Sequence, residues 1–121
     1  MRELRIVVAT AEAERLRGAM TIAAAQAALG GAATVFLQLD AVGLLRTPIQ
    51  APRDAAHRAA GLPSLEMLVE EALGLGVVIL ACQSGLALCG MTVESLPAGV
   101  EIGGPVGFLQ QMGDETRLLF A

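Results

Sequence analysis

One segment constrains the fold of this chain more than any other. Val77–Ala81 (VVILA) is a run of five apolar residues, three of them β-branched, with no polar side chain between them. A short run of this kind is typical of a strand that is covered on both faces. Such strands occur in parallel sheets, because the crossover connections place helices over the sheet. The rest of the chain is therefore expected to supply further strands that alternate with helices.

Apolar runs and helical stripes alternate from one end of the chain to the other. The further strands are predicted at Leu4–Ala9, Thr34–Leu39, Val100–Ile102 and Thr116–Phe120. The helices are predicted at Glu14–Leu29, from Pro63 and Ser64 onward, at Ser84–Cys89 and at Val106–Met112. We therefore predict one domain over residues 1–121, a three-layer α/β/α sandwich with a five-stranded, mainly parallel sheet. The strand order does not follow from the sequence.

The segment Arg46–Leu62 interrupts this alternation. It contains two prolines, three arginines and the only histidine, His57. We expect a mobile excursion with a helical turn near residues 54–60. The excursion could fold over the sheet edge and bring positive charge to an anionic sulfur species, or it could be a solvated loop. The sequence leaves both alternatives open.

The composition argues against several classes of protein. With 55% hydrophobic and 17% charged residues, the chain is not disordered. A net charge of −4 without a basic block argues against nucleic-acid binding. Two cysteines form no disulfide framework and no secretory signal is recognisable, so we expect a cytoplasmic protein with reduced thiols. Gly18–Leu39 and Ala72–Val93 carry no charge, but each is interpreted as a helix followed by a buried strand, not as a membrane span.

The candidate site lies at the carboxyl ends of the predicted strands, where open α/β sheets bind ligands. Cys82 is the one nucleophile there, between a buried strand and the start of a predicted helix. The free N–H groups and the dipole of a helix N-terminus favour a thiolate and could hold an oxyanion or a terminal persulfide sulfur. The residues predicted to bind sulfur or an anion beside it are Gln83, Ser84, Thr10, Gly103 and Gly104. The alternative is that Cys82 is a small buried hydrophobic residue.

Accessory residues are few. Cys89 lies on the same predicted helix as Cys82, about 10 Å further along its axis, which is too far for a disulfide while the helix persists. Cys89 is therefore interpreted as a packing residue in preference to a resolving thiol. His57 and Arg53 are the other accessory candidates. The cysteines and the histidine do not have zinc spacing, and the chain has no P-loop, dinucleotide-binding or CxxC motif, so we expect neither a metal nor another cofactor.

An ordered set of segments carries a family resemblance. After the first strand and its alanine-rich helix come TVFLQLDAVGLL, GVVILACQSGLALCGM, LPAGVEIGGPVGFLQQM and RLLF. This set resembles the DsrE/DsrF-like family of sulfur-relay and peroxiredoxin-like proteins over nearly the whole chain. The resemblance implies an α/β/α sandwich assembled into trimers or hexamers. It also implies that the cysteine matching Cys82 carries sulfur as a persulfide or thiosulfonate, exchanged with a rhodanese or a TusA-like carrier; Cys89 lies near the second cysteine of some members.

Three functions are consistent with these observations. The first is a sulfur-trafficking protein that carries sulfane sulfur on Cys82, either as a sulfurtransferase or as a carrier. The second is a non-catalytic oligomeric module that binds a small anion or a partner protein. A thiol peroxidase ranks last, because it needs a resolving thiol and an arginine beside Cys82.

Overall fold

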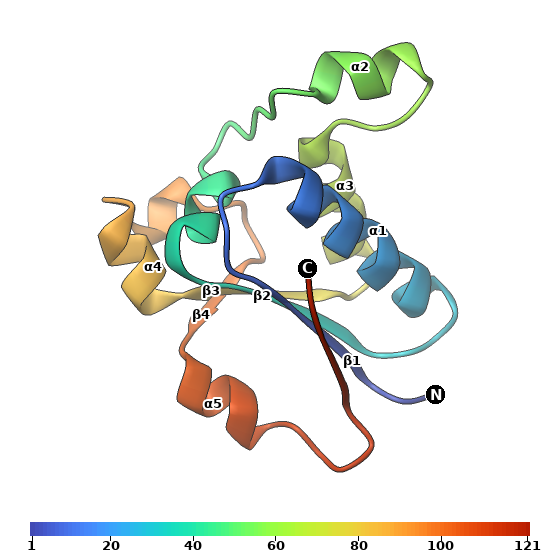
Figure 1. The fold of residues 1–121 in the computed structure, drawn as a ribbon, viewed down its shortest axis with the longest axis vertical. Coiled ribbons are helices and arrows are strands. Elements are labelled where there is room, and N and C mark those ends of the chain that lie inside the picture. Colours follow the sequence, from blue (N-terminus) through green and yellow to red (C-terminus); the bar gives the residue numbers. More distant parts are fainter.

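Five strands form one sheet in the computed structural model, which describes residues 1–121 (Figure 1). The strands are β1 (Leu4–Val8), β2 (Ala33–Leu37), β3 (Val78–Cys82), β4 (Glu101–Gly103) and β5 (Arg117–Phe120). They lie in the order β4-β3-β2-β1-β5, and every neighbouring pair is parallel. The prediction of a five-stranded parallel sheet is confirmed, and the predicted strand ends are correct to within two residues.

Helices lie on both faces of the sheet, as predicted. The α-helices are α1 (Ala13–Ala28), α2 (Asp54–Ala59), α3 (Leu65–Gly74), α4 (Gln83–Leu88) and α5 (Pro105–Gln110), and the 3₁₀ helices are η1 (Leu39–Leu45) and η2 (Val93–Ser95). Figure 1 shows α1 and α3 on one face and α5 on the other. From β1 to β4 the chain steps across the sheet in one direction, and it then returns to the far edge to form β5. Because crossovers between parallel strands are right-handed, this reversal moves the connecting helix to the opposite face.

The helix α1 packs its small residues against the sheet. Leu16, Met20, Ala23 and Ala24 of the predicted stripe are buried, whereas Ala28 at its end is exposed. The Thr10 hydroxyl, which the sequence also offers as an N-cap for this helix, does not cap it. The helix begins at Ala13, its N-cap is Glu12, and Thr10 lies exposed in a bend. The predicted end is confirmed, because Gly30 follows the helix with a φ of 90°, a conformation that glycine adopts without strain.

The prediction that the strand β3 is covered on both faces is wrong for one face. Ile79 and Ala81 are fully buried toward α1 and α3, but Val78 and Leu80 on the other face are half-buried. That second face is covered by α5, a helix of six residues and about 9 Å in length. A helix this short covers the carboxyl half of the sheet and leaves part of the amino half open.

The segment Arg46–Leu62 is anchored to the rest of the domain at several points. The Thr47 amide donates to the Ser95 carbonyl at 2.8 Å, and the amide of the buried Ile49 donates to the Glu66 carboxylate at 3.2 Å. Its predicted helical turn is confirmed as α2. The segment therefore packs against neighbouring elements through backbone and side-chain hydrogen bonds. None of the helices in the domain has both the length and the apolar character needed to cross a bilayer.

Candidate functional site

The chain leaves β3 and β4 toward opposite faces of the sheet. After β3 the connection passes through α4 and η2 to a loop that lies against α3, where a Cβ on Gly99 would stand 3.6 Å from the Leu73 side chain. After β4 the chain enters α5 on the other face (Figure 1). The chain therefore diverges toward the two faces at the carboxyl ends of β3 and β4, and these ends lie at the carboxyl edge of the sheet, where open α/β sheets bind ligands.

Cys82 and Gly103 lie side by side at this edge of the sheet. Cys82 is the last residue of β3, and its register partner on β4 is Gly103. Glycine places no side chain beside the thiol on that strand. Cys82 is 6% exposed and is also the N-cap of α4, whose first-turn amides have no acceptor within the helix. Gly104 follows as the N-cap of α5, so three of the predicted site residues come together here.

The helix α4 is held in place by close packing on η1. Gly85 is buried, and a Cβ at this position would collide with the Val42 side chain and stand 2.9 Å from the Leu39 carbonyl oxygen. Leu39 itself has a φ of 55°, which is unusual for a residue with a bulky side chain. Gln83 and Ser84, which were predicted to assist Cys82, are exposed on the first turn of this helix.

Cys89 lies at the other end of α4, as its C-cap. Its Sγ faces η1, 3.9 Å from the Asp40 carbonyl oxygen and 4.0 Å from that of Leu39. Both cysteines are free thiols. The continuous helix between them is confirmed, so the geometry separates Cys89 from Cys82 as the sequence predicted.

Comparison with known proteins identifies the fold. No protein-family model matches this chain, and no curated protein matches it. Solved structures similar to it include the following three. The ychN protein from E. coli has a TM-score of 0.75 and 21% identity over 100% of both chains. The protein of unknown function MTH1491 from Methanobacterium thermoautotrophicum has a TM-score of 0.74 and 17% identity over 100% of both chains.

The third similar structure is the conserved protein of unknown function BT1422 from Bacteroides thetaiotaomicron. It has a TM-score of 0.72 and 16% identity, with 99% of this chain and 95% of that chain covered. The chain shares the fold of these three proteins. At this level of identity the likeness concerns the architecture and does not extend to a function.

The structure does not bring the accessory candidates His57 and Arg53 to Cys82. His57 Nε2 lies 3.0 Å from a carboxylate oxygen of Glu14 on α1. Arg53 is exposed and immediately precedes α2, and Figure 1 shows α2 well separated from α4. The segment Arg46–Leu62 therefore does not fold over Cys82, which was one of the two alternatives left open by the sequence. Thr10 is exposed after β1 and contributes no cap to a helix.

Two polar residues in the strands were not singled out by the sequence analysis. Arg5 on β1 and Thr34 on β2 are register partners, and both are buried on the face that α5 partly covers. The signal was a single polar residue within each of two otherwise apolar runs, LRIVV and ATVFL. No group of three or more histidine, cysteine, aspartate and glutamate side chains is arranged to hold a metal ion.

Proposed function

We propose that this protein traffics sulfur: Cys82 takes a sulfane sulfur atom from a donor, holds it as a persulfide and passes it to a thiol of a partner protein. The observation that carries the proposal is the position of Cys82 at the carboxyl end of β3, where the chain enters α4, opposite Gly103 on β4. The resemblance of the ordered segments to the DsrE/DsrF-like family supports the same residue. By that resemblance, the proposed donor or acceptor is a rhodanese or a TusA-like carrier.

The chemistry requires a thiolate and no redox cofactor. In loading, the Cys82 thiolate attacks the terminal sulfur of a donor R–S–SH; the new S–S bond forms, the donor S–S bond breaks, and the donor leaves as R–S⁻. In unloading, an acceptor thiolate attacks the terminal sulfur of Cys82–S–SH, and Cys82 leaves as the thiolate. The first-turn amides of α4 are available to donate hydrogen bonds to the negative charge.

The burial of Cys82 restricts how a partner protein can approach the thiol. Cys82 is only 6% exposed, so a donor has restricted access to the thiol. The exposed side chains nearest in sequence, Gln83 and Ser84, border the carboxyl edge of the sheet. We therefore expect the donor to present a terminal sulfur atom on a narrow or flexible segment.

Intact-protein mass spectrometry tests the proposal. The wild type is exposed to polysulfide, thiosulfate or tetrathionate beside Cys82→Ser, with Cys89→Ser as the matched control. The expected result is an adduct in the wild type and in Cys89→Ser that reductant removes and that is absent in Cys82→Ser. An adduct that depends on Cys89, or none with any donor, would reject the assignment of the carrier thiol to Cys82.

A second candidate function, an oligomeric binding module, is favoured by the edge strand β5. Leu119 and Phe120 are 48% and 70% exposed, and exposed apolar side chains of α1 and α5 flank them. The Arg117 and Ala121 amides bond to β1, so the backbone groups of Leu118 and Phe120 point outward without partners. Two copies pairing antiparallel about Leu119 would satisfy these groups and cover the apolar side chains. Both functions are compatible with one assembly.

A further inference from the structure

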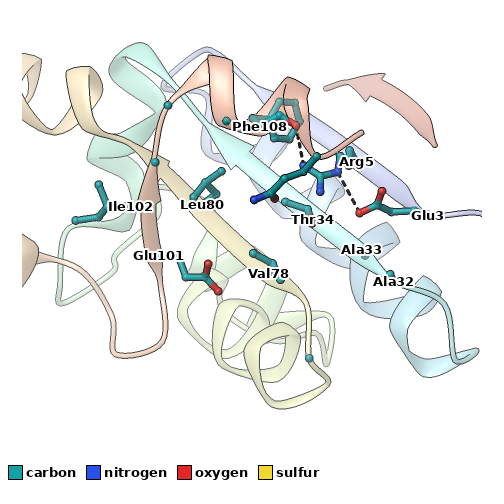
Figure 2. Close-up of a pocket in the computed structure, with 15 residues that line it drawn as sticks. Glu3, Arg5, Ala32, Ala33, Thr34, Val78, Leu80, Glu101, Ile102 and Phe108 are labelled. Carbon is teal, nitrogen blue, oxygen red and sulfur yellow. Dashed lines mark hydrogen bonds and ion pairs between the residues drawn. The ribbon is translucent and has the colours of Figure 1, made fainter. Parts of the chain in front are cut away.

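The open face of the sheet holds a polar cavity that shares Gly103 and Gly104 with the candidate site and has no role in the proposed sulfur transfer. It has a volume of about 350 Å³ and lies beside α5, over the amino halves of the central strands. Cys82 is not among the residues that line it. Figure 2 shows Arg5 and Glu101 on opposite sides of this cavity, with Val78 and Leu80 between them. The volume falls within the range of cavities that bind small molecules.

Arg5 is held rigidly at one side of the cavity. Its Nε donates to the Glu3 carboxylate at 3.1 Å, and its Nη1 donates to the Phe108 carbonyl at 3.1 Å. The guanidinium lies 5.0 Å from the centre of the Phe108 ring, which in turn stacks on Phe36. The side chain is 6% exposed, and its Nη2 makes no hydrogen bond. Because no fully buried side-chain nitrogen or oxygen lacks a partner, Nη2 opens onto the cavity.

Thr34 supplies a second open group beside Arg5. It is 5% exposed, it lines the same cavity, and its hydroxyl has no hydrogen-bond partner in the protein. By the same reasoning the hydroxyl faces the cavity. A fixed guanidinium nitrogen next to a free hydroxyl is an arrangement that binds a carboxylate group.

The opposite side of the cavity is negatively charged. Glu101 makes no ion pair, whereas Glu3 is occupied by Arg5 and by the Thr116 hydroxyl. The lining therefore carries a nearly neutral Arg5–Glu3 pair at one end and a free carboxylate at the other. Thr34 and Glu101 are two strands apart and two register positions offset, about 12 Å between Cα atoms, so a ligand that reaches both side chains needs several carbons between its two ends.

We infer that this cavity binds a small compound with a carboxylate at one end and a cationic group at the other, joined by a short aliphatic chain, the chemistry of a basic amino acid. The carboxylate binds Arg5 Nη2 and the Thr34 hydroxyl, the cation binds Glu101, and the aliphatic chain lies on Val78 and Leu80. Glycines leave the space open: Gly104 and Gly107 line the cavity, and a Cβ on either would meet no atom within 4 Å.

Isothermal titration calorimetry with matched probes tests this inference. The probe 6-aminohexanoate carries both charged ends, hexanoate lacks the cation, and hexylamine lacks the carboxylate; L-lysine serves as a natural compound of the same class. We expect 6-aminohexanoate and lysine to bind at least about tenfold more tightly than the two single-ended probes. Amide shifts in two-dimensional NMR should centre on Leu80 and Gly107.

Variants locate the binding site without disturbing the fold. Thr34→Val and Glu101→Gln should each weaken binding of 6-aminohexanoate by about tenfold. Gly107→Met should abolish binding by filling the cavity, whereas Gly18→Met, at another helical glycine with open space around it, should not. Cys82→Ser should bind normally, which separates this site from the sulfur chemistry.

Three results would each overturn the inference. The first is no binding of 6-aminohexanoate or lysine at millimolar concentration to a folded wild type. The second is equal binding of hexanoate or hexylamine, which would remove the requirement for two charged ends. The third is undiminished binding in Gly107→Met, which would place the ligand elsewhere.

Discussion

Arg17 Nη2 and Asp54 Oδ1 form an ion pair of 3.0 Å that joins α1 to the first residue of α2. Both side chains are largely buried, at 7% and 11% exposure. Asp54 also accepts hydrogen bonds from the amides of Ala51 and Leu65, each at 3.0 Å. This one carboxylate therefore ties together α1, the start of α2 and the start of α3, and it fixes the segment that the sequence suggested to be mobile.

Replacing Asp54 with asparagine should destabilise the domain by about 2–4 kcal/mol, because the buried Arg17 keeps only the more exposed Glu14 as a counter-charge and the amides of Ala51 and Leu65 lose a charged acceptor. Urea denaturation monitored by circular dichroism measures the change. Asp114→Asn, at an exposed position that makes no ion pair, is the control and should change stability little. A loss for Asp54→Asn no larger than that of the control would show that the ion pair does not anchor α2.

The Asp54 carboxylate should also make the stability of the domain depend on pH. Burial alone would raise the pKa of Asp54, but the amides of Ala51 and Leu65 and the Arg17 guanidinium lower this pKa to about 2, from a usual value of 3.8. A lowered folded-state pKa contributes stability above the unfolded value, and that contribution is lost as the pH falls through the folded value. About 2 kcal/mol should therefore be present at neutral pH and disappear between about pH 4 and pH 2. The stability difference between wild type and Asp54→Asn should shrink over this interval; a difference that stays constant would contradict the prediction.

Gly85→Ala should destabilise the domain although alanine favours helices. The added Cβ would collide with Val42 and approach the Leu39 carbonyl, a backbone atom that cannot move aside cheaply. We expect a net loss of about 1–3 kcal/mol from overpacking, after an intrinsic helix gain of about 1 kcal/mol. Gly107→Ala in α5 is the matched control, since open space surrounds that position, and it should gain stability. Equal gains in both variants would show that α4 can shift away from η1.

Thr34→Val should leave the domain as stable as the wild type or more stable by up to about 1 kcal/mol, because the hydroxyl has no protein partner to lose. Thermal unfolding measures the change. Thr21→Val provides the contrast: the Thr21 hydroxyl donates to the Arg17 carbonyl at 2.8 Å. A clear loss of stability in Thr34→Val would mean that this hydroxyl is bonded within the domain, contrary to the open geometry.

Local sequence patterns predicted the helices, the strands and the candidate thiol. The β-branched run before Cys82 identified the strand β3, and Ser64 does cap α3 by accepting from the Met67 amide. Cys82 was placed correctly at the junction of strand and helix, because both neighbours follow from hydropathy patterns. These inferences needed contacts between residues that are close in sequence.

The relationships that depend on tertiary packing could not be predicted in this way. The Arg17–Asp54 pair joins residues 37 positions apart, and the sequence pattern around either residue does not predict the other as its partner. The register that sets Arg5 beside Thr34 depends on a strand order that periodicity leaves open. The length of α5 decided which face of β3 is open, and helix ends are the least predictable feature of a pattern.

The edge strand β5 yields the last prediction. Phe120 is 70% exposed on a strand whose outward backbone groups are unpaired, and an unprotected apolar edge of this kind favours pairing with a second copy. Phe120→Glu should therefore lower the molar mass measured by light scattering after size exclusion, since a charge would be buried in the interface. Leu29→Glu is the control, because Leu29 is 74% exposed at the far end of α1. If the wild type is a monomer at high concentration, or if Phe120→Glu keeps the wild-type mass, β5 is not the assembly surface, and the second candidate function loses the observation that favours it.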